Sequence, residues 1–184
     1  MLLIRLGKSI LCSRIIGFLQ EEQKVTVAYY FCNSHNDGGN PCNQILRSLV
    51  LQLLRQHLDL PPHVCENYTN RGYNPSMQQL RKLLPELLDT IPAIRIIIDG
   101  LDECQEKMQK QVMQELLCLC TSSDGHCKIL FSSREVLRLV KLYAESSAYP
   151  SETRRKTWTQ IFNSSLIRAL PSCVKGSIAK RWTI

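Results

Sequence analysis

The most constraining feature of this 184-residue chain is a short apolar segment that ends in an acid. Residues 94–99 read Ile-Arg-Ile-Ile-Ile-Asp, so isoleucines occupy both alternating faces of an extended segment. A strand that is apolar on both faces must be covered on both sides, which is typical of a parallel sheet between layers of helices. Ligands of such sheets bind at the carboxyl ends of the strands, where Asp99 falls.

Two further segments, 25–32 and 127–134, have the same strand character, and the first is expected in the interior of the sheet. Segments with apolar residues at helical spacing alternate with the strands. Ser76 is a plausible N-cap for one of them. We expect helices at about 42–57, around the leucines between Leu80 and Leu88, at about 106–120 and over 136–144. This alternation predicts a three-layer α/β domain with a parallel sheet and right-handed crossovers.

A glycine, a lysine and a serine, Gly7-Lys8-Ser9, come before an apolar stretch with helical spacing. We expect the tripeptide to open that helix, where free amides and the helix dipole favour phosphate. Alone it is a weak signal. Its weight comes from Asp99, Asp102 and Glu103, which follow an apolar strand about 90 residues later and offer the oxygen ligands that Mg²⁺ prefers. Together the two features indicate a P-loop NTPase core.

Five segments of the chain resemble fungal NACHT-type NTPases of the STAND class, specifically the nephrocystin-like N-terminal P-loop module. The resemblance covers roughly residues 7–144 and implies an ATP- or GTP-binding signalling switch, similar to NLR-type proteins, that assembles with other proteins. The segments that carry it are Gly7-Lys8-Ser9, Val27-Ala28-Tyr29-Tyr30-Phe31-Cys32, Ile45-Leu46-Arg47-Ser48-Leu49, Ile98-Asp99-Gly100-Leu101-Asp102-Glu103-Cys104 and Phe131-Ser132-Ser133-Arg134.

The resemblance also implies a nucleotide-binding role for the first motif. Gly7 and Lys8 would contact the phosphates, and Ser9 and Asp99 would hold Mg²⁺. Read from the residues alone, Lys8 could equally be a solvated charge at the start of a helix.

The same resemblance implies catalytic roles at the other two motifs. Asp102 or Glu103 would position the attacking water, and Arg134 would act as a sensor at the end of the neighbouring strand. The simpler alternatives are that the two acids cap a helix beginning near Gln105 and that Arg134 is an exposed charge. Whether the chain hydrolyses nucleotide is left open by the sequence.

The phosphate loop departs from the family pattern. A full loop reads G-x-x-x-x-G-K-[ST], but the position of its first glycine is Leu2, and no residues remain for the strand before it. Residues 1–6 would have to be a substitute strand or a poor loop. Losing about three charge-assisted hydrogen bonds of roughly 1.5 kcal/mol each would weaken nucleotide binding about a thousandfold. We therefore expect an N-terminally truncated member or an incomplete gene model with impaired binding, or a degenerate fold that survives as a protein-interaction module.

The net charge of +7 is concentrated in the tail of the chain. Residues 1–144 hold 16 basic and 14 acidic side chains, whereas residues 145–184 hold 7 and 2. We therefore divide the chain into an NTPase-like domain at 1–145 and a basic, weakly structured tail at 146–184. The tail makes nucleic-acid binding the weakest hypothesis, because no aromatic interleaving accompanies its charges. The tail residues considered for such binding are Arg154, Arg155, Lys156, Lys175, Lys180 and Arg181.

Nine scattered cysteines fit a reducing compartment, and we expect a cytoplasmic protein. A zinc site is disfavoured, because the spacings do not contain the paired pattern of a metal knuckle. The residues considered for it are Cys104, Cys118, Cys120, His126 and Cys127. Charged residues interrupt every apolar run before the roughly 18 residues that a membrane span needs, so no membrane partner is expected.

Overall fold

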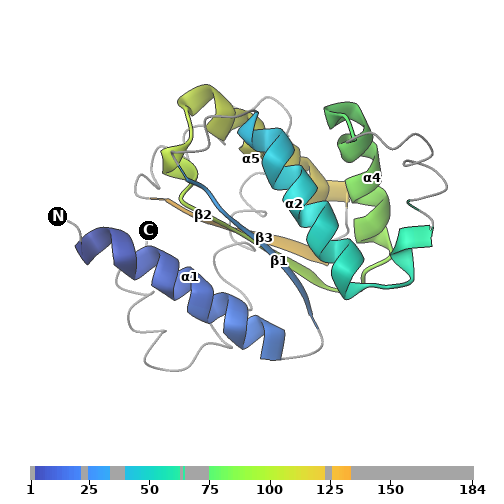
Figure 1. The fold of residues 1–184 in the computed structure, drawn as a ribbon, viewed down its shortest axis with the longest axis horizontal. Helices are drawn as coiled ribbons and strands as arrows, with labels where there is room; N and C mark the ends of the chain where they lie inside the picture. Colours follow the sequence, from blue (N-terminus) through green and yellow to red (C-terminus); the bar gives the residue numbers. More distant parts are fainter. Residues whose placement is uncertain are drawn as a thin grey trace. The chain divides into compact units, whose positions relative to one another are not determined.

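The computed structural model describes residues 3–21, 25–33, 40–62, 64, 75–122 and 126–133, with the backbone alone at 3–8 and 121–122 (Figure 1). All of these residues belong to the first of two units into which the chain divides, Met1–Glu145. The second unit, Ser146–Ile184, lies outside the described residues, as does the helix predicted over 136–144.

Three parallel strands form the sheet: β1 (Thr26–Phe31), β2 (Ile94–Asp99) and β3 (Cys127–Ser132), in the order β1-β2-β3. Their carboxyl ends meet at one edge, because Phe31 is in register with Asp99 and Asp99 with Ser132. The prediction of parallel strands in an α/β fold is confirmed. The prediction that 25–32 is an interior strand is wrong for the described sheet, since β2 lies in the middle and β1 at one side.

Helices cover both faces of the sheet (Figure 1). Helix α1 (Leu3–Glu21) packs on β1 and β2 from one face, and the helices α2 (Pro41–Gln56), α4 (Met77–Asp89) and α5 (Glu106–Ser122) lie together on the other. Side chains alternate along a strand, so Asp99 shares the α1 face of β2 with Ile97, while Ile96 and Ile98 face the opposite layer. Both faces of β2 are therefore shielded from water, which explains why isoleucines occupy both of them.

Helix α4 shows why its sequence folds where it does. Ser76 is its N-cap, as predicted: the amide of Gln79 donates to the Ser76 hydroxyl at 3.3 Å, and the Ser76 amide donates to the Gln79 side chain at 2.8 Å. This reciprocal pair satisfies two amides that the first turn leaves without helical partners. The apolar face of the helix is completely buried, and it consists of Leu80, Leu83, Leu84, Leu87 and Leu88.

Helix α1 begins earlier than the sequence suggested. We expected Gly7-Lys8-Ser9 to open the helix and residues 1–6 to be strand or loop, but the helix starts at Leu3 and runs through the tripeptide. The cause is that residues 3–6, Leu-Ile-Arg-Leu, contain no glycine or proline to stop a helix from extending toward the N-terminus. The amides of Gly7, Lys8 and Ser9 are thus inside the helix, where they donate to carbonyls four residues earlier.

The outer edge of β1 is closed by side chains of α2. The side chain of Gln52 accepts from the Tyr29 amide at 3.0 Å and donates to the Tyr29 carbonyl at 2.7 Å, in the way that a neighbouring strand would. Gln56 donates to the Val27 carbonyl at 2.9 Å. These side-chain bonds replace the backbone bonds that a further strand would make to β1. Because its backbone groups have partners, β1 can lie at the side of the described sheet.

No helix in the described ranges is long and apolar enough to cross a membrane.

Replacing Gln52 by alanine should lower the free energy of unfolding by about 1–3 kcal/mol, because both backbone groups of Tyr29 lose their partner in a half-buried place. Urea denaturation of the full chain measures this change. The matched control is Gln20→Ala on the exposed side of α1, expected to alter stability by less than about 0.5 kcal/mol. Equal effects of the two substitutions would contradict the role given to Gln52.

Candidate functional site

The candidate site is centred on Asp99, the last residue of β2. Its side chain is only 4% exposed although it is a carboxylate. The strand ends on either side fix its backbone: the Cys32 amide donates to the Asp99 carbonyl at 2.8 Å, and the Gly100 amide donates to the Ser132 carbonyl at 3.0 Å. Asp99 is therefore held at the carboxyl edge of the sheet, where the sequence predicted a ligand site.

Two side chains of α1 reach this carboxylate. The Ser9 hydroxyl donates to Asp99 Oδ2 at 2.5 Å, across 90 residues of sequence, and the Cys12 thiol donates to Asp99 Oδ1 at 3.6 Å. Ser9 and Cys12 are three residues apart, so both face the sheet from one side of the helix. Each carboxylate oxygen thus has a partner, which offsets the cost of removing the charge from water.

Cys12 was not among the predicted site residues. The signal that could have found it is its position three residues after Ser9 in a helix in which Ile15, Ile16 and Leu19 are also buried.

A tight turn follows Asp99 and carries the two other acids. Gly100 has a φ of 71°, in the left-handed region that favours glycine, and a Cβ at this position would meet the Cys32 carbonyl oxygen at 3.1 Å. The 3₁₀ turn η1 (Leu101–Glu103) comes next, with Asp102 half-buried and Glu103 exposed. Both acids thus precede α5, which begins at Glu106.

Two thiols lie beside this turn. Cys32 comes directly after β1 and Cys104 directly after η1, and both are half-buried. The neighbouring Cys104 thiol, burial and the negative charges of Asp99 and Glu103 raise the pKa of Cys32 well above its usual value. The neighbouring Cys32 thiol lowers the pKa of Cys104. Sequence reasoning considered Cys104 for a zinc site but did not pair it with Cys32.

The remaining predicted residues are placed less fully. Gly7 and Lys8 are described by their backbone, inside α1 and next to Ser9. Arg134 lies outside the described residues, which end at Ser133 after β3. The structure thus brings Ser9 and Asp99 together and puts Asp102 and Glu103 on the adjoining turn.

The cysteines and histidine considered for zinc do not gather at one place. Cys118 and Cys120 lie on α5 and Cys127 at the amino end of β3, whereas Cys104 follows η1 at the carboxyl edge of the sheet. His126 bonds to the Leu88 carbonyl through its ring at 3.2 Å. Within the described part of the chain, no three potential ligands from histidine, cysteine, aspartate and glutamate are grouped as a metal site.

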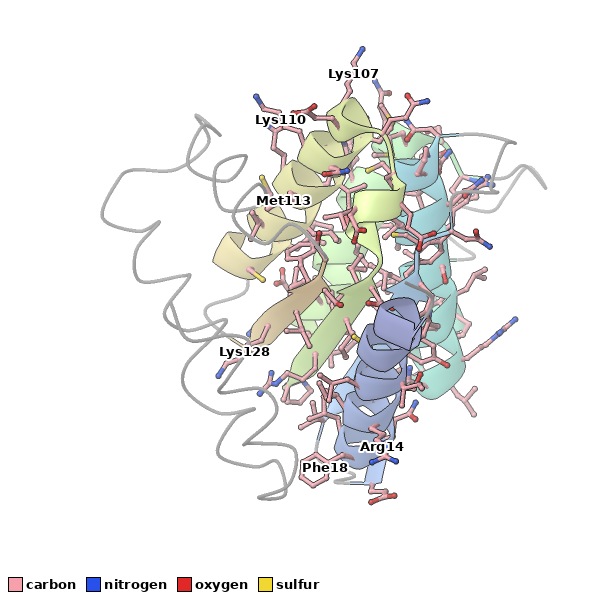
Figure 2. The ribbon with its side chains drawn as sticks, turned by 90° about the vertical axis from the view of Figure 1, so that its left-hand side faces the viewer. Arg14, Phe18, Lys107, Lys110, Met113 and Lys128 are labelled. Atoms are coloured by element: carbon pink, nitrogen blue, oxygen red, sulfur yellow. The ribbon has the colours of Figure 1, made fainter. Side chains whose placement is uncertain are left out.

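Figure 2 shows the ribbon with its side chains, turned by 90° from the view of Figure 1, and labels four of the basic residues. Lys107 and Lys110 project from α5, Arg14 from α1 and Lys128 from β3, so the described cations are spread over different elements. Burial and the neighbouring charge of Arg95 lower the pKa of Lys128.

A model of a known protein family matches most of the chain. The family model described as nephrocystin 3, N-terminal, matches residues 5–134. The matched range includes the tripeptide in α1, the whole described sheet and the turn after Asp99. None of the curated proteins and none of the solved structures compared with the chain matches it.

Alanine at Gly100 should destabilise the fold by at least about 1–2 kcal/mol, the cost of a left-handed backbone for a residue with a Cβ, with the close approach to Cys32 adding to it. The matched control is Gly17→Ala in α1, where a Cβ would meet nothing within 4 Å. That control should gain about 0.5–1 kcal/mol, because alanine favours a helix over glycine. Thermal or urea unfolding of both variants measures the difference, and a Gly100→Ala protein as stable as the parent would show that the turn is described wrongly.

Proposed function

Because the chain belongs to the nephrocystin 3 N-terminal family, we propose that it is a signalling module of the NACHT type whose fold binds a Mg²⁺-nucleotide, ATP or GTP, with impaired affinity. The observation that carries the proposal is the bond between Ser9 and Asp99 at 2.5 Å. A serine beside the lysine of the first motif and an acid at the end of a buried strand meet there, as a phosphate loop and a magnesium-binding strand require.

The donor set at this place fits a magnesium ion in part. Mg²⁺ is usually bound by one or two carboxylates together with waters and substrate phosphates. Asp99 supplies a carboxylate, and Ser9 supplies a hydroxyl oxygen that is hydrogen-bonded to that carboxylate. When bound, the ion would neutralise charge on the phosphate oxygens. Ser9 and Asp99 would hold the ion together.

The other residues receive roles by the same proposal. Lys8, next to Ser9, would pair with the phosphates as a point charge. Asp102 and Glu103 lie on the turn that leaves the site, and one of them would orient a water. Arg134, beyond the end of β3, would act as a sensor of the phosphates. Hydrolysis would be a further step and is not needed for a switch that works by binding.

The early start of α1, at Leu3, supports the proposal that the affinity for nucleotide is impaired. In a phosphate loop, backbone amides turn toward the anion. Here the amides of Gly7, Lys8 and Ser9 belong to the interior of a helix that begins at Leu3. A loss of about three such bonds corresponds to a thousandfold weaker complex, in the millimolar instead of the micromolar range.

The second candidate is an interaction module that has kept the fold without the nucleotide. The observation that favours it is the same helix: the bonds that Ser9 and Cys12 make to Asp99 complete the site without a ligand. A carboxylate satisfied by its own protein no longer needs a cation for its stability.

Titration of the full chain with labelled ATP, and separately GTP, distinguishes the two candidates. We expect a millimolar dissociation constant with Mg²⁺ and at least tenfold weaker binding without it or in Asp99→Asn. The control is Asp89→Asn, an exposed acid at the end of α4, which should bind as the parent does.

The two contradicting outcomes are distinct. No binding at about 10 mM nucleotide would end the nucleotide proposal in favour of the interaction module. Micromolar affinity that Lys8→Ala abolishes would end the claim of impairment.

A further inference from the structure

We propose that a groove between α2 and the outer edge of β1, the edge away from β2, binds an acidic amphipathic helix of another protein. The groove has a volume of about 470 Å³ and is lined by residues of these two elements. Helix α2 covers the face of the sheet opposite to α1, which holds the Asp99 side chain (Figure 1). The proposal therefore does not depend on nucleotide binding.

One row of α2 side chains forms the outer wall of the groove: Arg47, Leu51 and Arg55. Successive members are four residues apart, so they lie one above the other on one side of the helix. Leu51 is 53% exposed although it is a large apolar side chain. At about 1.5 Å per residue, the row places a cation about 6 Å along the helix on either side of this leucine.

The positive charge of the row is not neutralised by its own elements. Neither α2 nor β1 contains an acidic residue, and no acid lines the groove. Arg47 donates through Nη2 to the Pro75 carbonyl at 3.4 Å, while its Nε has no hydrogen-bond partner among the described residues. A guanidinium carries several N–H donors, so both arginines keep donors for an anionic ligand.

The inner wall of the groove decides what shape of ligand fits. Gln52 bonds to both backbone groups of Tyr29 and also donates to the Ser48 hydroxyl at 3.1 Å. An extended peptide gains its affinity from backbone bonds to a free strand edge, and here Gln52 already makes those bonds to Tyr29. A helix satisfies its own backbone and needs no such bonds. The ligand is therefore a helix that contacts the groove through side chains.

The outer row also sets the sequence pattern of that helix. Carboxylates pair with guanidinium groups through two parallel hydrogen bonds, and an apolar side chain covers Leu51. Residues four apart on the partner helix repeat at the same spacing of about 6 Å, so the matching pattern is acid-x-x-x-apolar-x-x-x-acid. Anchors at this spacing are how helices are recognised in grooves.

The matching helix belongs to a different protein, because this chain does not contain the pattern. No two of its 16 acidic residues are eight positions apart. A second copy of the chain therefore offers no acid–apolar–acid row of the required length. A groove of this size, with one helix as its ligand, buries less area than a stable complex needs, which predicts a dissociation constant of about 10–100 µM.

The test is fluorescence anisotropy of labelled peptides with the full, unaltered chain. The probe is an alanine- and glutamine-based helix of about 18 residues with one Glu-x-x-x-Leu-x-x-x-Glu row. The control peptide has the same composition, with its leucine moved to the opposite side of the helix. We expect the probe to bind with a dissociation constant of about 10–100 µM at low salt and the control peptide to bind at least about tenfold more weakly. Raising the salt concentration from about 0.05 to about 0.5 M should weaken the binding of the probe.

Variants of the chain then assign the contacts. Arg47→Ala and Arg55→Ala should each weaken binding by about threefold or more, and Leu51→Asp by about tenfold or more. The matched control is Lys107→Ala, an exposed cation of α5, which should leave binding within about twofold of the parent (Figure 2). The double variant Arg47→Glu with Arg55→Glu should instead bind a peptide with a Lys-x-x-x-Leu-x-x-x-Lys row.

The outcomes that would overturn the proposal are distinct. They are no binding of the probe at about 1 mM, equal binding of the probe and the control peptide, or an equal loss of affinity in Lys107→Ala and Arg47→Ala. A dimer of the chain that Leu51→Asp dissociates would assign the groove to a second copy instead. Because the comparison of the two peptides uses the unaltered chain, it decides the question even where a variant folds poorly.

Discussion

The structure depends on a buried carboxylate that its own protein must satisfy. Asp99 ends the central strand of the described sheet at 4% exposure, and an unpartnered charge in that place would cost several kcal/mol. Ser9 and Cys12 remove this penalty from α1, while Ile15, Ile16 and Leu19 of the same helix are buried. The polar bond therefore sets where along the sheet the helix sits, and the apolar contact holds it there.

The turn after Asp99 follows from the same constraint. With the Asp99 side chain committed to α1, its carbonyl accepts from Cys32 and the chain must leave the sheet through the left-handed Gly100. This exit places the η1 turn, with Asp102 and Glu103, directly after the site. One strand end thus brings together a carboxylate and a hydroxyl, and the proposed binding originates there.

Much of this could be predicted from the sequence because the signals are local. Isoleucines on both faces of an extended segment predicted β2, and Ser76 before a leucine-rich stretch predicted the start of α4. The pairing of Ser9 with Asp99 followed from the combination of two motifs. The start of α1 at Leu3 was missed because a known tripeptide was given more weight than helix propensity. The position of β1 was missed because side chains such as Gln52 can replace a neighbouring strand, and the bond from Cys12 to Asp99 was missed because it forms only when α1 packs on β2.

A double-mutant cycle between Ser9 and Asp99, each replaced by alanine alone and together, tests the central claim most directly. If the bond positions α1, urea unfolding of the four proteins should give a coupling free energy of about 1.5–3 kcal/mol, the range for a hydrogen bond to a charged group. The matched cycle with Ser13→Ala, an exposed hydroxyl on α1 that donates to the Ser9 carbonyl, should give a coupling to Asp99 near zero. Additive effects of the Ser9 and Asp99 substitutions, or equal couplings in the two cycles, would contradict the account.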